Sequence, residues 1–230
     1  MVSSRAAWVL LLAAMALLAP RARASSDFQL WSELGVRYRF AKRWQLKVDA
    51  HLRFDENLSA TRSLAPECAI SYRVWKYMRL EAGYRSVIEP IESRERTYAD
   101  TWHRFFVDLR FRYRIKPVTL RLRLRGQEQF GWPWKNGEEL NVRHTLRQKL
   151  GAEWKTGCGL VPLLSGELFV RLADPDGALH KWRLTAGLDY ELGAHLLGLF
   201  YRLEDVIDDP EEPVRHILGL GYHFHFGGTR

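Results

Sequence analysis

The stretch Val118-Thr119-Leu120-Arg121-Leu122-Arg123-Leu124-Arg125 decides the fold class of this chain. An aliphatic residue stands at every second position, and threonine or arginine stands between. Successive side chains of a β-strand point to opposite faces, so the segment predicts a strand with one apolar and one cationic face. The same alternation recurs along most of the chain, which predicts an all-β protein.

The connections between the alternating segments also follow a pattern. Short connections are predicted at 41–43, 75–77, 116–117, 155–159 and 192–193, and longer polar ones at 55–63, 89–100, 131–139, 174–177 and 205–213. Transmembrane barrels have short periplasmic turns and longer outer loops, and aromatic residues gather where their strands meet the membrane interface. Aromatic residues of the apolar face stand beside nearly every short connection here: Phe40, Trp44, Tyr72, Tyr113, Trp154, Tyr190 and Tyr222.

We therefore predict a single up-and-down antiparallel transmembrane β-barrel of about 10–12 strands, with its apolar face toward lipid. The pattern itself gives about 11 strands. A bacterial barrel with both ends in the periplasm needs an even number, so we expect 10 or 12, roughly one more or one fewer than the pattern. A soluble periplasmic ligand-binding barrel, with its apolar face inward, is the alternative.

The N-terminal residues 1–24 have the features of a signal peptide. Arg5 precedes an uncharged apolar run from Ala6 to Leu18, and Ala22-Arg23-Ala24 fits a cleavage site. No later segment is long and apolar enough for a membrane helix. We therefore predict export, a barrel domain over residues 25–230, and location in a bacterial outer membrane.

The cysteine count and the net charge exclude little. Cys68 and Cys158 are expected near opposite ends of their strands, too far apart for a disulfide. The formal net charge is +8. We predict no nucleic-acid partner, because most arginines alternate with apolar residues and form no basic surface run.

Three pieces of the chain resemble a known family. They are Trp44-Gln45-Leu46 through Leu52-Arg53-Phe54-Asp55, Gly83-Tyr84-Arg85, and His216-Ile217-Leu218-Gly219-Leu220-Gly221-Tyr222-His223-Phe224. They are similar to an exported bacterial family known as domain of unknown function 2490, and the resemblance covers nearly the whole mature chain. It implies an outer-membrane-like barrel and no agreed activity, so it implies no functional residues.

The face opposite the apolar one is crowded with charge. Seven arginines are our candidates for contact with an anion in the barrel lumen: Arg110, Arg112, Arg121, Arg123, Arg125, Arg143 and Arg147. Guanidinium groups suit phosphate and carboxylate because they donate paired hydrogen bonds. Carboxylates that could neutralise them stand on the same predicted face: Glu33, Asp49, Glu67, Glu81, Asp108, Glu153, Glu167 and Asp189. The lumen is then either plugged by ion pairs, which we favour, or a narrow anion-preferring pore.

Metal and catalytic sites find less support in the sequence. His223 and His225 lie two apart on the predicted lumen face, but the sequence identifies no third ligand, so we predict no metal and no cofactor. Outer-membrane phospholipase barrels resemble one another in a His-x-Ser pair on the lipid face. No serine stands two residues after His103, His144 or His216, and no Gly-x-Ser-x-Gly occurs. We predict that the chain is not an enzyme, with a lipid-modifying barrel enzyme as an alternative.

The predicted outer loops offer two further features. Trp132 and Trp134 place two indole rings in one loop, for anchoring at the membrane interface or for stacking on a glycan. Acidic residues gather in another: Glu204, Asp205, Asp208, Asp209, Glu211 and Glu212. A weak divalent-ion site there could bridge lipopolysaccharide phosphates. Membrane lipid is the predicted partner, lipopolysaccharide is a second candidate, and protein partners stay open.

Overall fold

The computed structural model describes residues 26–55, 58–92, 97–131, 142–172, 179–209 and 211–228. The predicted signal peptide and the pair Trp132 and Trp134 lie outside these residues. The described residues contain no helix long and apolar enough to cross a bilayer. Their regular secondary structure consists of β-strands, so the predicted all-β class is confirmed.

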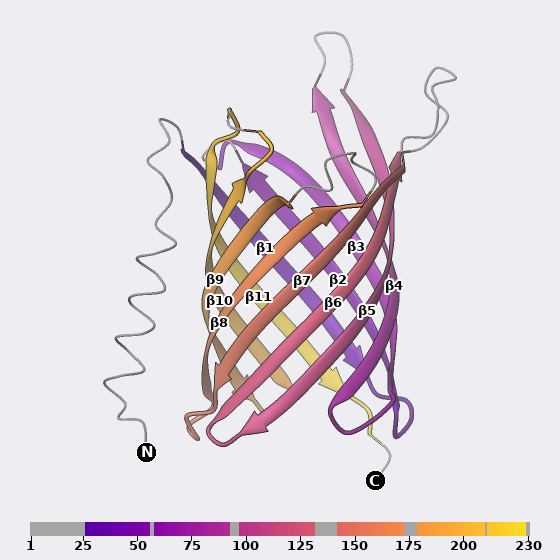
Figure 1. Ribbon diagram of the computed structural model, residues 1–230, viewed down its shortest axis with the longest axis vertical. Helices are drawn as coiled ribbons and strands as arrows, with labels where there is room; N and C mark the ends of the chain where they lie inside the picture. Colours follow the sequence, from indigo (N-terminus) through magenta and orange to yellow (C-terminus); the bar gives the residue numbers. More distant parts are fainter. Residues whose placement is uncertain are drawn as a thin grey trace.

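The strands close into one barrel (Figure 1). They are β1 (Ser26–Tyr38), β2 (Trp44–Asp55), β3 (Ala60–Arg73), β4 (Met78–Glu92), β5 (Thr97–Ile115), β6 (Val118–Gly131), β7 (Val142–Trp154), β8 (Leu160–Arg171), β9 (Leu179–Leu192), β10 (His195–Val206) and β11 (Val214–Phe226). Each strand pairs antiparallel with the next in sequence, as the up-and-down prediction required.

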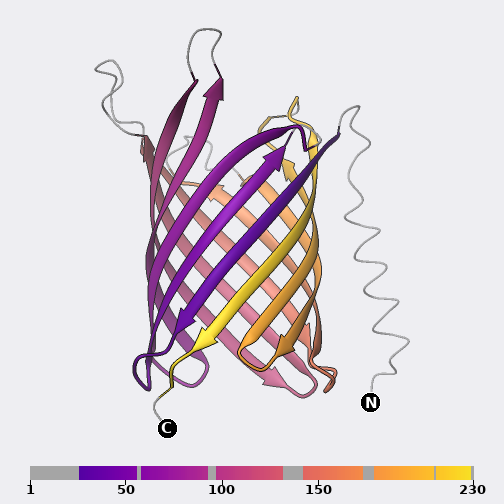
Figure 2. The ribbon, with the colours of Figure 1, turned by 180° about the vertical axis from the view of Figure 1, so that it is seen from behind.

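The closing pair is the exception to this rule. β1 and β11 pair in parallel, in register from Ser26 opposite Val214 to Tyr38 opposite Phe226, and they lie side by side in Figure 2. The expectation of an even number of strands is therefore wrong, and the 11 strands that the pattern gave are confirmed. An odd number puts the start of β1 at the rim of the long connections and the end of β11 at the rim of the short turns.

Three predicted loops are shorter than expected. β3 begins at Ala60, inside the predicted loop 55–63, and β4 and β5 extend to Glu92 and from Thr97, inside the predicted loop 89–100. β10 also continues through Glu204 and Asp205, which we had assigned to an acidic loop. Polar residues on the inner face of a barrel strand look like loop residues in sequence, which explains these errors.

The outer wall of the barrel is apolar. Leu34, Val107, Leu150 and Leu199 are each about half exposed or more, with exposed fractions of 58%, 53%, 63% and 49%. Many exposed aromatic residues lie toward the short turns, where Phe40 stacks with Trp44 and Trp44 packs against Tyr72. Others, such as Phe28 and Tyr201, lie nearer the long connections. Polar and charged side chains fill the interior. Most of the buried ones alternate along the strands with the exposed apolar residues of the outer wall.

Candidate functional site

The barrel interior has two parts. We call the part nearer the long connections the loop half; its main side chains are Trp31, Phe106, Asp108, Arg125, Arg147, Glu167, Phe169, Arg183 and Glu204. We call the part that reaches the short turns the turn half; its side chains line the cavity described below. The alternation along each strand sends these residues inward, and the closed sheet brings residues from distant strands together.

A buried ion pair joins β5 and β6 in the loop half. Arg125 donates from Nε to Oδ1 of Asp108 at 2.5 Å, and from its terminal nitrogen to Oδ2 at 2.9 Å. The side chains of Asp108 and Arg125 are 0% and 3% exposed. The Arg125 guanidinium also lies 3.7 Å from the ring centroid of Phe106. Two-point contact of this kind fixes the planar guanidinium in one orientation.

Two further carboxylates collect several cations each. Glu167 on β8 accepts hydrogen bonds from Arg123 at 2.6 Å and from Arg147 at 2.8 Å. Glu204 on β10 pairs with Arg183, Arg215 and Lys181. Glu204 is 1% exposed, so it belongs to the interior and not to a solvated acidic loop as we had predicted.

Aromatic rings lie between these cations. The guanidinium groups of Arg53, Arg202 and Arg183 stand 4.1, 5.0 and 5.3 Å from the Trp31 ring centroid. Phe169 is contacted in the same way by three cations of the loop half: Arg147, Arg183 and Lys181. Rings of this kind attract a cation to their face and keep water from it. The loop half is thus densely packed with paired or stacked cations.

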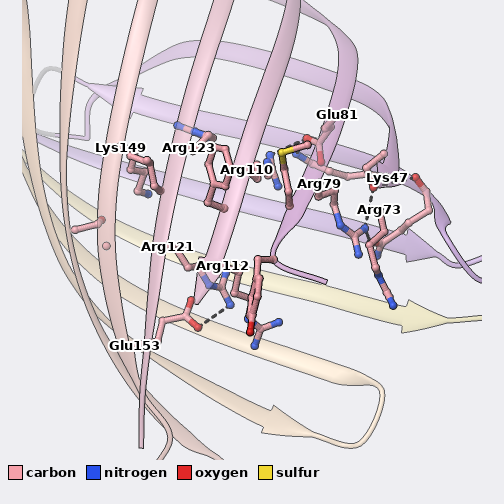
Figure 3. Close-up of a pocket in the computed structure, with 18 of the residues that line it drawn as sticks. Lys47, Arg73, Arg79, Glu81, Arg110, Arg112, Arg121, Arg123, Lys149 and Glu153 are labelled. Carbon is pink, nitrogen blue, oxygen red and sulfur yellow. Dashed lines mark hydrogen bonds and ion pairs between the residues drawn. The ribbon is translucent and has the colours of Figure 1, made fainter. Parts of the chain in front are cut away.

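The turn half contains a cavity of about 770 Å³. Residues of the β3–β4 turn, Trp75 to Tyr77, form part of its wall, so the cavity extends to the rim of the short turns. Figure 3 shows the cationic side chains pointing into it from several strands. The charged side chains that line it are Arg37, Arg39, Arg73, Arg79, Arg110, Arg112, Arg121, Arg123, Lys47, Lys76, Lys149, Glu81, Glu153 and Asp189.

The cavity wall has many more cations than carboxylates. Eight arginines and three lysines face three carboxylates. Arg121 pairs with Glu153 at 2.6 Å, and Arg110 pairs with Glu81 at 2.7 Å. Within the described chain, no carboxylate pairs with Arg39, Arg73, Arg79, Arg112 or Lys149. These five cations can therefore bind an anion without giving up a carboxylate, although Arg79 also donates hydrogen bonds to Gln45 at 2.5 Å and to Ser71 at 2.9 Å.

The seven predicted anion-contact arginines fall into different surroundings. Arg110, Arg112, Arg121 and Arg123 line the cavity. Arg125 and Arg147 are buried in the ion pairs of the loop half. Arg143 lies away from the cavity, with its guanidinium 5.3 Å from the ring centroid of Trp102.

Several cavity residues were not among the candidates. Arg39 directly follows β1, and Arg73 and Arg79 lie on β3 and β4, whereas our choice followed the local density of arginine in β5 to β7. Lys149 lies on β7 but was not chosen because only arginines were considered. The register brings β1, β3 and β4 to the same cavity. Applying the alternation rule to every strand could have added these four residues to the candidates, since each stands an even number of positions from its inward-facing neighbours.

Three histidines of the outer wall contact a tyrosine or a glutamate in the part of the chain that the structure describes. His103 shares a 2.6 Å hydrogen bond with the Tyr84 hydroxyl, and His216 shares one of the same length with Tyr201. His144 lies 3.3 Å from a carboxylate oxygen of Glu128. Ser86 stands opposite His103 in the β4–β5 register, but no hydrogen bond between these two described residues is present.

Comparison with known proteins gives one result. The family model described as "Protein of unknown function (DUF2490)" matches residues 28–212. The matched range contains β2 to β10 in full and all but the first two residues of β1. The comparison with curated proteins finds no match to the chain.

Proposed function

The chain belongs to the DUF2490 family of proteins of unknown function, as the sequence resemblance predicted, and we propose that it is a bacterial outer-membrane β-barrel that binds anionic groups in its turn-half cavity. The observation that carries this proposal is the surplus of cations on the cavity wall. Guanidinium groups without a carboxylate partner favour phosphate or carboxylate ligands, because each can donate two parallel hydrogen bonds to them.

The composition of the two barrel faces supports the membrane location. A continuous apolar outer wall with aromatic residues toward one rim matches what a bilayer demands of a closed barrel. A barrel in water would place these exposed leucines inward and its arginines outward. Under this proposal the short turns face the periplasm, so the cavity opens toward that compartment.

The loop half supports a plugged barrel over a narrow pore. Its carboxylates pair with buried arginines, and its aromatic rings stack between them. We therefore propose that small anions reach the cavity from one side and do not cross. Planar bilayers containing the protein should stay silent. Stable cation-selective conductance would contradict the proposal, because the cavity wall is cationic.

We also propose that the chain is not an enzyme. On this basis the purified protein should hydrolyse no phospholipid. Hydrolysis that is lost in His103→Ala, where Ser86 stands opposite in the register, would instead establish the lipid-modifying alternative.

The anion site can be tested with inorganic tripolyphosphate and the purified protein in detergent micelles. Isothermal titration should show binding that weakens as sodium chloride is added, because salt screens the cavity charges. The double variant Arg73→Ala, Arg112→Ala should bind roughly tenfold more weakly or worse, since one charge-assisted hydrogen bond contributes about 1.5–3 kcal/mol.

Lys42→Ala is the matched control for this titration. Lys42 is an exposed cation at the same rim, in the β1–β2 turn, and does not line the cavity. Its removal should leave tripolyphosphate affinity nearly unchanged. Equal loss in the control and in the double variant would mean that the ligand is attracted by net charge alone, and the proposed site would be wrong.

The two cysteines test the membrane location. Both are free and exposed, in agreement with the prediction that they do not pair. Cys68 lies on β3 and faces outward, whereas Cys158 lies in the β7–β8 turn. The Thr156 hydroxyl, 3.0 Å from the Cys158 sulfur, lowers the pKa of that thiol and so favours the reactive thiolate.

In phospholipid nanodiscs, a polar maleimide should modify Cys158 and leave Cys68 unmodified, because hydrocarbon covers the outer wall. Unfolding in detergent and urea should make both react, which is the internal control. Equal modification of both cysteines by the folded protein, with no uptake into nanodiscs, would favour the soluble periplasmic barrel.

A further inference from the structure

A cluster of carboxylates and imidazoles lies where the barrel closes. Glu33 on β1, Asp49 on β2 and His223 on β11 each bring one possible ligand atom to within 4.8 Å of the other two. A second group shares Asp49 and adds His51 and Glu67. We propose that Glu33, Asp49 and His223 form a zinc site that links the first two strands to the last. None of these three residues lines the proposed anion cavity, although Arg37 and Lys47 both line the cavity and contact Asp49. The proposal does not depend on anion binding.

The spacing of the three residues suits a metal with mixed nitrogen and oxygen ligands. One imidazole binds a given zinc ion through only one of its two nitrogens, and possible ligand atoms of the three residues, one from each, lie within 4.8 Å of one another. His223 Nδ1 lies 3.8 Å from Asp49 Oδ1, and the other ring nitrogen, Nε2, lies 3.5 Å from Glu33 Oε1. Ligand atoms around a tetrahedral zinc ion are separated by roughly 3.4 Å, given metal–ligand bonds of about 2.0–2.1 Å. Imidazole and carboxylate together favour zinc over calcium or magnesium, which prefer oxygen ligands alone.

Two atoms of the cluster are buried and have no hydrogen-bond partner. They are Oδ2 of Asp49 and Nδ1 of His223, and the Asp49 side chain is fully buried. A buried polar atom without a partner is costly, so it calls for a ligand or an ordered water. A zinc ion bound by both atoms would satisfy them together.

The nearby cations leave a place for the metal. Arg37 binds Asp49 through Oδ1, not Oδ2. Lys47 lies 3.4 Å from Oδ2 but 2.7 Å from Glu67, so its closer partner is Glu67. Zinc at Oδ2 therefore requires Lys47 to stay with Glu67, and the Arg37 contact can remain.

Glu33 is the less constrained of the two carboxylates of the proposed site. Its closest ion-pair partners are His51 at 3.4 Å and His223 at 3.5 Å, whereas Arg37 lies 3.8 Å away. A carboxylate between two imidazoles can orient one of them toward a metal through a hydrogen bond or bind the metal itself.

Glycine makes this arrangement possible at the closing pair. Gly35 stands opposite His223 on β11 and opposite Asp49 on β2. A Cβ atom at this position would collide with both the Asp49 carboxylate and the His223 imidazole. The lack of a side chain therefore lets residues from the two ends of the chain meet inside the barrel.

The predicted effect of zinc is on barrel closure. β1 and β11 are joined by a parallel ladder, a pairing slightly less stable per residue than an antiparallel one. A ligand that binds the closed barrel only shifts unfolding to higher temperature. The experiment uses the full chain in detergent micelles, treated with a chelator and then titrated with zinc chloride.

We expect one zinc ion per chain by isothermal titration and a rise of several degrees in the midpoint of heat-induced gel-mobility change. His223→Ala and the isosteric Glu33→Gln should each weaken zinc binding by roughly tenfold or more and reduce the midpoint shift. Each variant is compared with its own metal-free form, so lower intrinsic stability does not affect the result. Magnesium chloride should produce no shift.

His216→Ala is the matched control, because His216 lies on the same strand but bonds to Tyr201 on the outer wall. It should keep the affinity of the unaltered chain. Retention of zinc binding in both site variants would overturn the proposal. An equal loss of zinc affinity in His225→Ala would also overturn it, because the ion would then lie on the adjacent pair His223 and His225. The absence of zinc binding would overturn it as well, and an ordered water would then be the partner of the buried Asp49 and His223 atoms.

Discussion

The two halves of the barrel interior use the same residue types but differ in how their cations are paired. In the loop half, Asp108, Glu167 and Glu204 are buried, and each pairs with two or more cations. In the turn half, Arg73 and Arg112 have no carboxylate partner within the described chain. Arg73 and Arg112 line the cavity that reaches the rim, where water can solvate them. Arg53 and Arg202 of the loop half instead stack on the Trp31 ring.

Two arginines of one strand show how local this difference is. Arg121 and Arg125 lie four residues apart on β6 and point to the same side of the sheet. The Arg121 side chain is 52% exposed and Arg125 is 3% exposed. An arginine-rich strand therefore does not by itself specify plug or binding site; the residues opposite each guanidinium do.

The largest effect is expected from breaking the buried pair of the loop half. Asp108→Ala leaves Arg125 buried without its carboxylate, and removing one partner of such a pair costs about 3–5 kcal/mol. The free energy of unfolding in urea, measured in lipid vesicles, should fall by that amount. A loss below about 1 kcal/mol would show that water reaches Arg125 and that the loop half is not closed.

A smaller loss is expected when a charge enters the outer wall. Leu122 lies beside Arg121 and Arg123 but points outward. Leu122→Arg should lower the free energy of unfolding in vesicles by about 2–4 kcal/mol if the residue faces the bilayer midplane.

Arg123→Leu should cost less than Leu122→Arg, because Glu167 keeps Arg147 as a partner. This variant is the matched control on the same strand. Equal folding yields for the two variants in vesicles would contradict an outward face toward lipid.

The smallest effect is expected at the rim of the short turns. Lys155 and Glu191 form an ion pair there, and the Glu191 side chain is half exposed. Lys155→Ala should change the free energy of unfolding by about 0–1 kcal/mol, as for most exposed pairs. Urea unfolding checks this value, and a loss as large as that of Asp108→Ala would remove the contrast between buried and solvated pairs.

Much of the fold could be predicted from the sequence because a barrel wall imposes one simple rule. Alternation between Leu122 and Arg123 assigns both to opposite faces without any knowledge of the neighbouring strand. The count of 11 alternating segments and the positions of the short turns followed from the same rule. The expectation of an even number of strands was wrong because we required both ends of the chain on the same side of the membrane. This constraint does not apply when β1 and β11 close the barrel in parallel.

The site could be predicted only in part. Arg112 and Arg121 were identified as inward, but whether a guanidinium is paired depends on strands far away in the sequence. Glu204, assigned to an acidic loop, meets Arg183 and Arg215 only because β9, β10 and β11 are adjacent. The partners of His223 come from β1 and β2, so no local spacing could reveal them.

The odd number of strands gives the chain a built-in orientation marker. The backbone enters the wall at Ser26 on one rim and leaves after Phe226 on the other. In an even-stranded barrel both ends emerge on the same side, and a tag at either end reports the same compartment. If the barrel spans a membrane as proposed, a short epitope ahead of Ser26 and a second one after Phe226 would mark opposite faces of that membrane. The direction of insertion can thus be determined from the two ends of the chain, without altering a loop.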